Sequence, residues 1–324
     1  MILLNIVVLL IGFVALIKGA DIFVDGSTGI ARLFHVSGLV IGLTIVALGT
    51  SAPELAVSTA AAIRGSNEIA LSNVIGSNLF NILMVLGIGA TVRKLPVEMS
   101  VIKRDFPVSI IAAVFVLIVT GHSVLPVKFA SMDMAENTGI LVRPAAILLL
   151  IGFVIYMVSL VLEAKKNPEE AEEEVKVSVV KSIFMILFGI ALIVAGGEAV
   201  VDSAKSIASA LGLSETLIGL TVVAVGTSLP ELVTSLVAAG KGETGLAVGN
   251  AVGSNIFNIM FILGVSCTIH PVNANVASTW DLIILLAISL LTWIFCMRGK
   301  SLNRVEGLIM VLCYVGTIAF AIVR

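Results

Sequence analysis

The sequence reads VALGTSAPEL at residues 46–55 and VAVGTSLPEL at residues 223–232. Each copy places a glutamate, Glu54 or Glu231, directly after a proline inside an apolar stretch. Proline has no backbone N–H and clashes with the preceding turn, so it interrupts a helix. A buried carboxylate is costly unless another group compensates its charge. The chain carries this combination twice, which indicates that the two copies act together.

The composition is that of an integral membrane protein. Of the 324 residues, 59% are hydrophobic and 12% are charged, whereas a soluble domain carries roughly a quarter charged residues. The mean hydropathy is +1.16. The net charge of −2 carries no information about nucleic acid, but the sequence has no basic, aromatic-rich patch, so no nucleic-acid partner is expected. The three cysteines show no CxxC spacing, so we expect neither a zinc site nor a disulfide framework.

Apolar runs of about 20 residues are long enough to cross the lipid bilayer as helices. We therefore predict an all-α membrane protein with ten transmembrane helices. They are placed near residues 2–33, 38–63, 68–91, 105–121, 144–163, 179–210, 215–239, 245–267, 280–297 and 304–323. The first run lacks the basic segment of a signal peptide and is interpreted as the first span. The first and sixth spans exceed the bilayer thickness, so they should tilt.

The chain is a tandem repeat. When the sequence is shifted by 177 residues, NVIGSNLFNI (73–82) aligns with NAVGSNIFNI (250–259), and the two proline motifs also align. The repeat divides the chain into a first half (1–162), an acidic solvated linker (163–178) and a second half (179–324). Each half has five predicted spans, an odd number, so the second half should be inverted in the membrane. Inverted repeats with helices broken at matching positions are typical of secondary transporters whose site lies at mid-membrane.

Basic residues predict the orientation. With both termini outside, thirteen Lys and Arg residues lie in or beside the inner loops and five lie on the outer side. This asymmetry favours N- and C-termini outside and a cytoplasmic linker. No organelle-targeting segment is recognisable, so the cell membrane is the expected location.

The proline motif is rich in oxygen ligands. We expect the break before Pro53 to free the backbone carbonyls of Ala47 and Thr50, which are tolerated at that depth only when a cation or water satisfies them. Thr50 and Ser51 add hydroxyl groups beside Glu54. These are the hard ligands that sodium and calcium ions prefer.

The second motif adds amides and a hydroxyl. Asn73, Ser77 and Asn81 are spaced four residues apart and share one helical face. The second half repeats the set as Asn250, Ser254 and Asn258.

Facing motifs would form a cage with a formal charge of −2. That charge neutralises one Ca²⁺, or it could be balanced by two or three Na⁺. Without a cation, repulsion between Glu54 and Glu231 would favour a proton on one of them, so Ca²⁺, Na⁺ and H⁺ would compete. The alternative for a single intramembrane glutamate is a structural hydrogen bond, which is less plausible for two in matched motifs. For Asn73 and Asn250, helix bracing and direct ligation both stay open.

The duplicated GTS-x-PE and GSN-x-xN blocks resemble the α-repeats of the cation/calcium exchanger superfamily, in particular the compact prokaryotic members of its sodium/calcium exchanger branch. The resemblance covers essentially the whole chain. It implies alternating access, in which two long tilted helices (2–33 and 179–210) slide against a core of eight helices. No cofactor is expected, and a cage completed within one chain allows a monomer to transport.

The resemblance also implies the ligands. The central calcium site would use the carboxylates of Glu54 and Glu231 with the carbonyls of Thr50 and Thr227. Further residues implied are Ala47 and Ala224 (carbonyls) and Ser77 and Ser254 at flanking sodium sites, Ser51 and Ser228 along the ion passages, and Asn81 and Asn258 in the middle.

One position departs from the family pattern. Many family members, including the potassium-dependent exchangers, carry aspartate in the second repeat where this chain has Asn258. The departure weakens any prediction of potassium co-transport and leaves the sodium stoichiometry open. The predicted function is therefore an antiporter that exports Ca²⁺ in exchange for Na⁺, with Ca²⁺/H⁺ antiport through the same glutamates as the alternative.

Two other classes fit less well. A cation channel usually builds its filter between subunits, whereas here both halves of the cage lie in one chain. An intramembrane enzyme lacks its usual motifs, because neither HExxH nor GxGD occurs.

Overall fold

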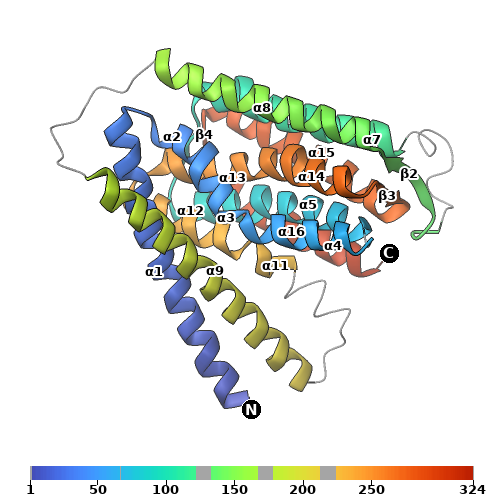
Figure 1. Ribbon diagram of the computed structural model, residues 1–324, viewed down its shortest axis with the longest axis horizontal. Coiled ribbons are helices and arrows are strands. Elements are labelled where there is room, and N and C mark those ends of the chain that lie inside the picture. Colours follow the sequence, from blue (N-terminus) through green and yellow to red (C-terminus); the bar gives the residue numbers. More distant parts are fainter. Residues whose placement is uncertain (1, 66, 122–132, 167–177, 212–223, 324) are drawn as a thin grey trace.

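The computed structural model describes residues 2–65, 67–121, 133–166, 178–211 and 224–323, and this part of the chain is almost entirely helical (Figure 1). The predicted all-α class is confirmed. Most of the acidic linker and the first residues of the predicted span 215–239 lie outside the described residues.

Two long helices pack chiefly against each other and extend beyond one side of the remaining bundle (Figure 1). They are α1 (Ile2–Phe34) and α9 (Val179–Ala210). Glycines let their backbones approach closely, since a Cβ atom on Gly19 would lie 2.8 Å from the Ile193 nitrogen. Gly12 faces Gly196 and Gly26 faces Met185, so the contacts run in opposite directions along the two helices. The pair is therefore antiparallel.

The first proline motif breaks a helix, as predicted. The segments α2 (Gly38–Ile41), η1 (Gly42–Val46, π-helical) and α3 (Ala47–Thr50) form one continuous rod. The next helix, α4 (Ala52–Ile63), is bent by 49° from that rod. The second motif is likewise divided between α11 (Ala224–Thr227) and α12 (Leu229–Lys241).

Two continuous helices lie in the core beside the broken ones. The first is formed by α5 (Asn67–Phe80), η2 (Asn81–Leu86) and α6 (Gly87–Val92), and the second by α13 (Thr244–Ile256), η6 (Phe257–Ile262) and α14 (Leu263–Ile269). Each changes to π-helical geometry near its second-motif asparagine, Asn81 or Asn258. Local π-helix often accompanies functional sites, because it redirects side chains.

The periphery completes the bundle. Its helical segments are η3 (Val101–Asp105), α7 (Phe106–Gly121), α8 (Arg143–Lys166), α15 (Val276–Gly299) and α16 (Arg304–Val323). Many large apolar side chains are exposed on α8 and α16, as expected where a helix faces lipid rather than water.

Two pairs of short strands link the loops that connect the helices. Strand β1 (Leu95–Pro96) pairs antiparallel with β4 (Ser301–Leu302), and β2 (Asn137–Leu141) pairs antiparallel with β3 (Val272–Asn275). The predicted topology places the first pair on the cytoplasmic side and the second pair outside.

Within the described ranges, seven single helices are long and apolar enough to cross a membrane, and the bent pair at Gly38–Ile63 makes eight. Two of the ten predicted spans do not meet that test. Helix α7 has only 16 residues, and the span predicted at 215–239 begins outside the described part.

Candidate cation-binding site

The two motif glutamates lie at equivalent places in the fold. Glu54 is in the first turn of α4 and Glu231 is in the first turn of α12, each just after a break. Both side chains are fully buried, with no exposed surface. The positive end of each helix dipole points toward its carboxylate, which lowers the cost of the buried charge.

Serines from opposite halves join the two carboxylates. The Ser51 hydroxyl donates to Glu231 Oε1 at 2.7 Å, and the Ser228 hydroxyl donates to Glu54 Oε1 at 3.0 Å. Ser77 donates to the same Glu54 oxygen at 3.3 Å. Because each serine reaches the glutamate of the other half, the two broken helices meet face to face, as the sequence predicted.

Asn73 and Asn250 brace the broken helices. Asn73 Nδ2 donates to the Ser58 hydroxyl at 2.9 Å and lies 3.4 Å from the Glu54 carbonyl. Asn250 Nδ2 donates to the Ser235 hydroxyl at 3.0 Å. The sequence analysis missed the two serines, although the shift by 177 residues aligns them and could have found them. Bracing therefore accounts for the amide nitrogens of Asn73 and Asn250.

Thr50 contacts the second half through Asn250. Its hydroxyl lies 3.0 Å from Asn250 Oδ1 and 3.1 Å from the Val46 carbonyl. The hydroxyl of Ser254, the repeat equivalent of Ser77, is buried and makes no hydrogen bond among the described residues. Thr227, the repeat equivalent of Thr50, is half-buried.

A reciprocal asparagine pair lies between the continuous helices. Asn78 Nδ2 donates to the Asn255 backbone carbonyl at 3.2 Å, and Asn255 Nδ2 lies 3.4 Å from the Asn78 carbonyl. Asn258 Nδ2 donates to Asn78 Oδ1 at 3.0 Å. All three side chains are buried.

Several buried polar atoms of the site have no hydrogen-bond partner among the described residues. They include Glu54 Oε2, Glu231 Oε2, Asn258 Oδ1, the hydroxyls of Thr227 and Ser254, and both amide atoms of Asn81. An unpaired buried polar atom costs stability, so a cluster of them marks a place where another species supplies the missing interactions. Most of these atoms are oxygens, which suits a cation.

The carbonyl of Ala47 is not released by the break. It accepts the Ser51 amide at 3.1 Å, so the expectation that this carbonyl is free is wrong. Proline removes the hydrogen bond to the residue four positions earlier, and for Pro53 that residue is Gly49. A carbonyl can still bind a cation with its second lone pair, and a ligand role for Ala47 stays a prediction. Ala224 begins α11 at the equivalent position.

The ligand set has few charges. The part of the chain that the structure describes contains no group of three or more His, Cys, Asp or Glu side chains that could hold a metal. The cage instead combines two carboxylates with hydroxyls and amides. A ligand set made mostly of uncharged oxygen atoms fits hard cations, and it differs from the thiolate and imidazole sites of zinc or copper.

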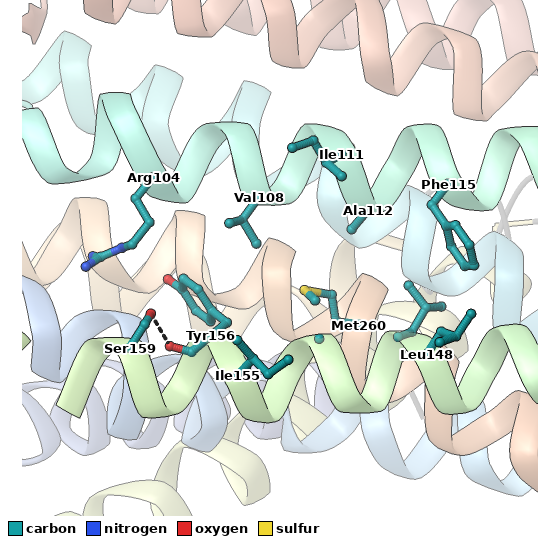
Figure 2. Close-up of a pocket in the computed structure, with 12 residues that line it drawn as sticks. Arg104, Val108, Ile111, Ala112, Phe115, Leu148, Ile155, Tyr156, Ser159 and Met260 are labelled. Carbon is teal, nitrogen blue, oxygen red and sulfur yellow. Dashed lines mark hydrogen bonds between the residues drawn. The ribbon is translucent and has the colours of Figure 1, made fainter. Parts of the chain in front are cut away.

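A separate concavity of about 380 Å³ lies between α7 and α8 (Figure 2). Its lining is apolar except at one end, where Arg104, Tyr156 and Ser159 lie. The Arg104 charge is countered by ion pairs with Asp105 and Glu163. An apolar groove with a compensated arginine offers no ligands to a cation, so it is not the ion site.

Two buried carboxylates that meet at facing helix breaks, inside an apolar helical bundle, define a membrane cation transporter of the secondary type rather than an enzyme. The chain belongs to the sodium/calcium exchanger protein family, whose pattern matches residues 4–162 and 181–323.

Relatives span nearly the full length. A putative antiporter, CaxA of Alkalimonas amylolytica, is 39% identical over 319 residues, or 95% of each chain. The sodium/calcium exchanger MaX1 of Methanosarcina acetivorans is 34% identical over 97% of each chain. The solved structure of the sodium-calcium exchanger NCX_Mj, soaked with Na⁺ and Sr²⁺, superposes with a TM-score of 0.82 at 34% identity, covering 98% of this chain and 99% of that one.

Proposed function

We propose that this protein exports Ca²⁺ across the cell membrane in exchange for Na⁺ by alternating access. The observation that carries the proposal is the crosswise pairing of Ser51 with Glu231 and of Ser228 with Glu54. That pairing places two carboxylates in one buried cage with oxygens left unpaired. Two negative charges match one Ca²⁺ or a set of Na⁺, so the two ions compete for the same place.

We assign the ligand roles as follows. Glu54 and Glu231 hold Ca²⁺ together with the carbonyls of Thr50 and Thr227. The remaining ligands are the carbonyls of Ala47 and Ala224, the hydroxyls of Ser77, Ser254, Ser51 and Ser228, and the amide oxygens of Asn81 and Asn258.

The topology follows the same proposal. Ten spans form two inverted halves, 1–162 and 179–324, joined by a cytoplasmic linker at 163–178, with both termini outside. The antiparallel packing of α1 on α9 supports the inversion, because the repeat makes these two helices equivalent. One chain contains the whole cage, so a monomer suffices for transport.

The decisive experiment loads the purified protein into liposomes. An outward-directed Na⁺ gradient should drive ⁴⁵Ca²⁺ uptake, and a pH gradient of equal size should not. Glu54→Gln serves as the control, because it keeps the shape of the side chain and removes one charge. Uptake driven by Na⁺ in that variant would contradict the assigned site.

Voltage provides a second readout. Exchange of three Na⁺ for one Ca²⁺ moves one net charge, which is worth about 2.3 kcal/mol per 100 mV. Uptake should therefore respond to membrane potential. A cycle that ignores the potential would exclude this stoichiometry while leaving sodium coupling intact.

Ca²⁺/H⁺ antiport is the second candidate. It is favoured by one observation: both carboxylates are buried, and no ion pair with a cationic side chain is formed by either glutamate in the described ranges. Protons could then replace Na⁺ as the counter-ion. Uptake driven by the pH gradient alone, without Na⁺, would select this function.

A further inference from the structure

A short series of hydrogen bonds lies between the two continuous helices, and the donor and acceptor of each bond are determined by chemistry. The Asn255 backbone carbonyl can only accept a hydrogen bond, so the amide atom of Asn78 that faces it at 3.2 Å is the NH₂ group. The other amide atom of Asn78 is therefore the oxygen, which also only accepts. It follows that Asn258 must turn its own NH₂ group toward Asn78, at 3.0 Å.

These contacts leave Asn258 Oδ1 as the last atom in the series of hydrogen bonds. That oxygen is buried and has no hydrogen-bond partner among the described residues. Asn258 lies on η6, and η6 packs against α4, the helix that carries Glu54. We propose that Asn78 is a positioning residue that orients the Asn258 amide, so that an oxygen rather than an NH₂ group faces the transported cation.

The inference rests on the proposed function and adds a residue to it. An amide can bind a cation only through its oxygen, and an NH₂ group turned toward the ion would repel it. A side-chain amide can rotate by half a turn at small steric cost, so its orientation depends on a hydrogen-bond partner. The Asn255 carbonyl, acting through Asn78, supplies that partner.

The repeat provides a matched control. Asn255 is the equivalent of Asn78, and its NH₂ group makes the equivalent contact with the Asn78 carbonyl. Its Oδ1, however, accepts no hydrogen bond from the described residues, and neither amide atom of Asn81 has a partner there. Asn78 and Asn255 thus share one structural contact, but only Asn78 reaches an ion-cage amide.

The test measures equilibrium binding of ⁴⁵Ca²⁺ and its displacement by Na⁺ in detergent. Asn78→Ala should weaken cation binding about three- to tenfold, the usual effect of one lost hydrogen bond. Asn255→Ala should change binding less than twofold. Thermal unfolding should shift in both variants, because each loses one contact to a backbone carbonyl, and the shift should be larger for Asn78→Ala, which also loses the contact with Asn258.

A double-mutant cycle separates positioning from general damage. In an Asn258→Ala background, the further change Asn78→Ala should have almost no effect on binding, because its target is gone. Equal losses from Asn78→Ala and Asn255→Ala, or additive effects with Asn258→Ala, would overturn the proposal. If the wild-type protein bound no Ca²⁺, or if Glu54→Gln bound it normally, the proposed function itself would fail, and this inference with it.

Discussion

Lys241 and Arg64 occupy equivalent positions in the two halves, yet among the described residues only Lys241 forms ion pairs with a long helix. Each lies one residue before a glycine with positive φ, Gly242 (+92°) or Gly65 (+74°), in the turn that follows a motif helix. Glycine is favoured there because the left-handed conformation strains other residues. Lys241 Nζ lies 2.7 Å from Asp21 Oδ1 on α1, and a second aspartate one turn later also binds it.

The other half carries residues of the same charge at these positions without the contact. Glu198 and Asp202 on α9 are the repeat equivalents of the two aspartates on α1. No ion pair joins Arg64 to either of them in the described structure, and Asp202 instead lies 3.8 Å from Lys205 on its own helix. In the cage, the glutamate of each half accepts a hydrogen bond from a serine of the other half. The ion pair that joins a motif helix to a long helix, called a tie below, forms in only one half of the described structure.

This difference shows that the two halves of a repeated sequence can form different contacts in one conformation. A transporter that exchanges the roles of its halves should close the Arg64 tie when the Lys241 tie opens. The hydrogen bonds between serines and glutamates in the cage should be present in both conformations. The ion pair of Lys241 should form in the described conformation, and that of Arg64 in the conformation with the roles of the halves exchanged. Four predictions test this division between a symmetric centre and an asymmetric edge.

The largest effect should come from the symmetric centre. Glu54→Gln and Glu231→Gln should each reduce Ca²⁺ transport at least 100-fold, because a buried cation loses a full opposing charge in a low-dielectric site. The two losses should match within a factor of about three. The measurement is ⁴⁵Ca²⁺ flux in proteoliposomes, and one variant that keeps normal transport would disprove the paired cage.

The glycine contacts of the long helices should also respond symmetrically. Gly19→Ala and Gly196→Ala place a Cβ atom 2.8 Å from the Ile193 nitrogen and 2.6 Å from the Leu16 nitrogen, respectively. Overpacking of this kind typically costs about 1–3 kcal/mol, which thermal unfolding in detergent would detect.

Gly316→Ala is the matched control for these variants, since its added Cβ would have no described atom within 4 Å apart from its chain neighbours and the adjacent backbone of its own helix. It should leave the unfolding temperature unchanged or raise it slightly. If Gly316→Ala were as destabilising as Gly19→Ala, helix flexibility rather than close packing would explain the loss.

The crosswise serines should have intermediate effects. Ser51→Ala removes the donor to Glu231, and Ser228→Ala removes the donor to Glu54. A hydrogen bond to a charged group is worth about 1.5–3 kcal/mol, so Ca²⁺ affinity should change by roughly ten- to a hundredfold in each variant. Competition binding measures the change, and affinities that differ widely between the two variants would show that the cage is not symmetric.

The smallest effects should come from the ties, and here the halves should differ in sign. Lys241→Gln should shift the protein away from the described conformation, and Arg64→Gln should shift it toward that conformation. Exposed ion pairs contribute about 0.2–1 kcal/mol, so the population ratio should change up to about fivefold. Spin-label distances between α1 and α12, in a background without the native cysteines, would measure it. Shifts in the same direction would refute the exchange of ties.

Much of the fold and part of the site could be read in advance. Hydropathy located the long helices, and the repeat identified the break at Pro53 and the glutamates beside it. These features are local: a run of apolar residues must avoid water, and a proline in the interior of a helix removes a hydrogen bond of that helix. The bracing serines could also have been found, because Ser58 and Ser235 align in the repeat.

Other features required the packed chain. The carbonyl of Ala47 was expected to be free, but it accepts the amide of Ser51, the residue that caps the end of α3. The direction of the Asn78 amide depends on a carbonyl 177 residues away. No local pattern contains such a contact.

The sequence by itself determined that two oxygen-rich breaks lie within the membrane and that they are copies of each other. The tertiary structure decided to which glutamate each serine donates its hydrogen bond, because Ser51 and Ser228 both donate to the glutamate of the opposite half. It also decided that Lys241 is tied to α1 while Arg64 is not tied to α9 in the described chain. The reason is physical: the matched motifs have similar local preferences, so the partner that each side chain finds depends on how the two halves pack against each other.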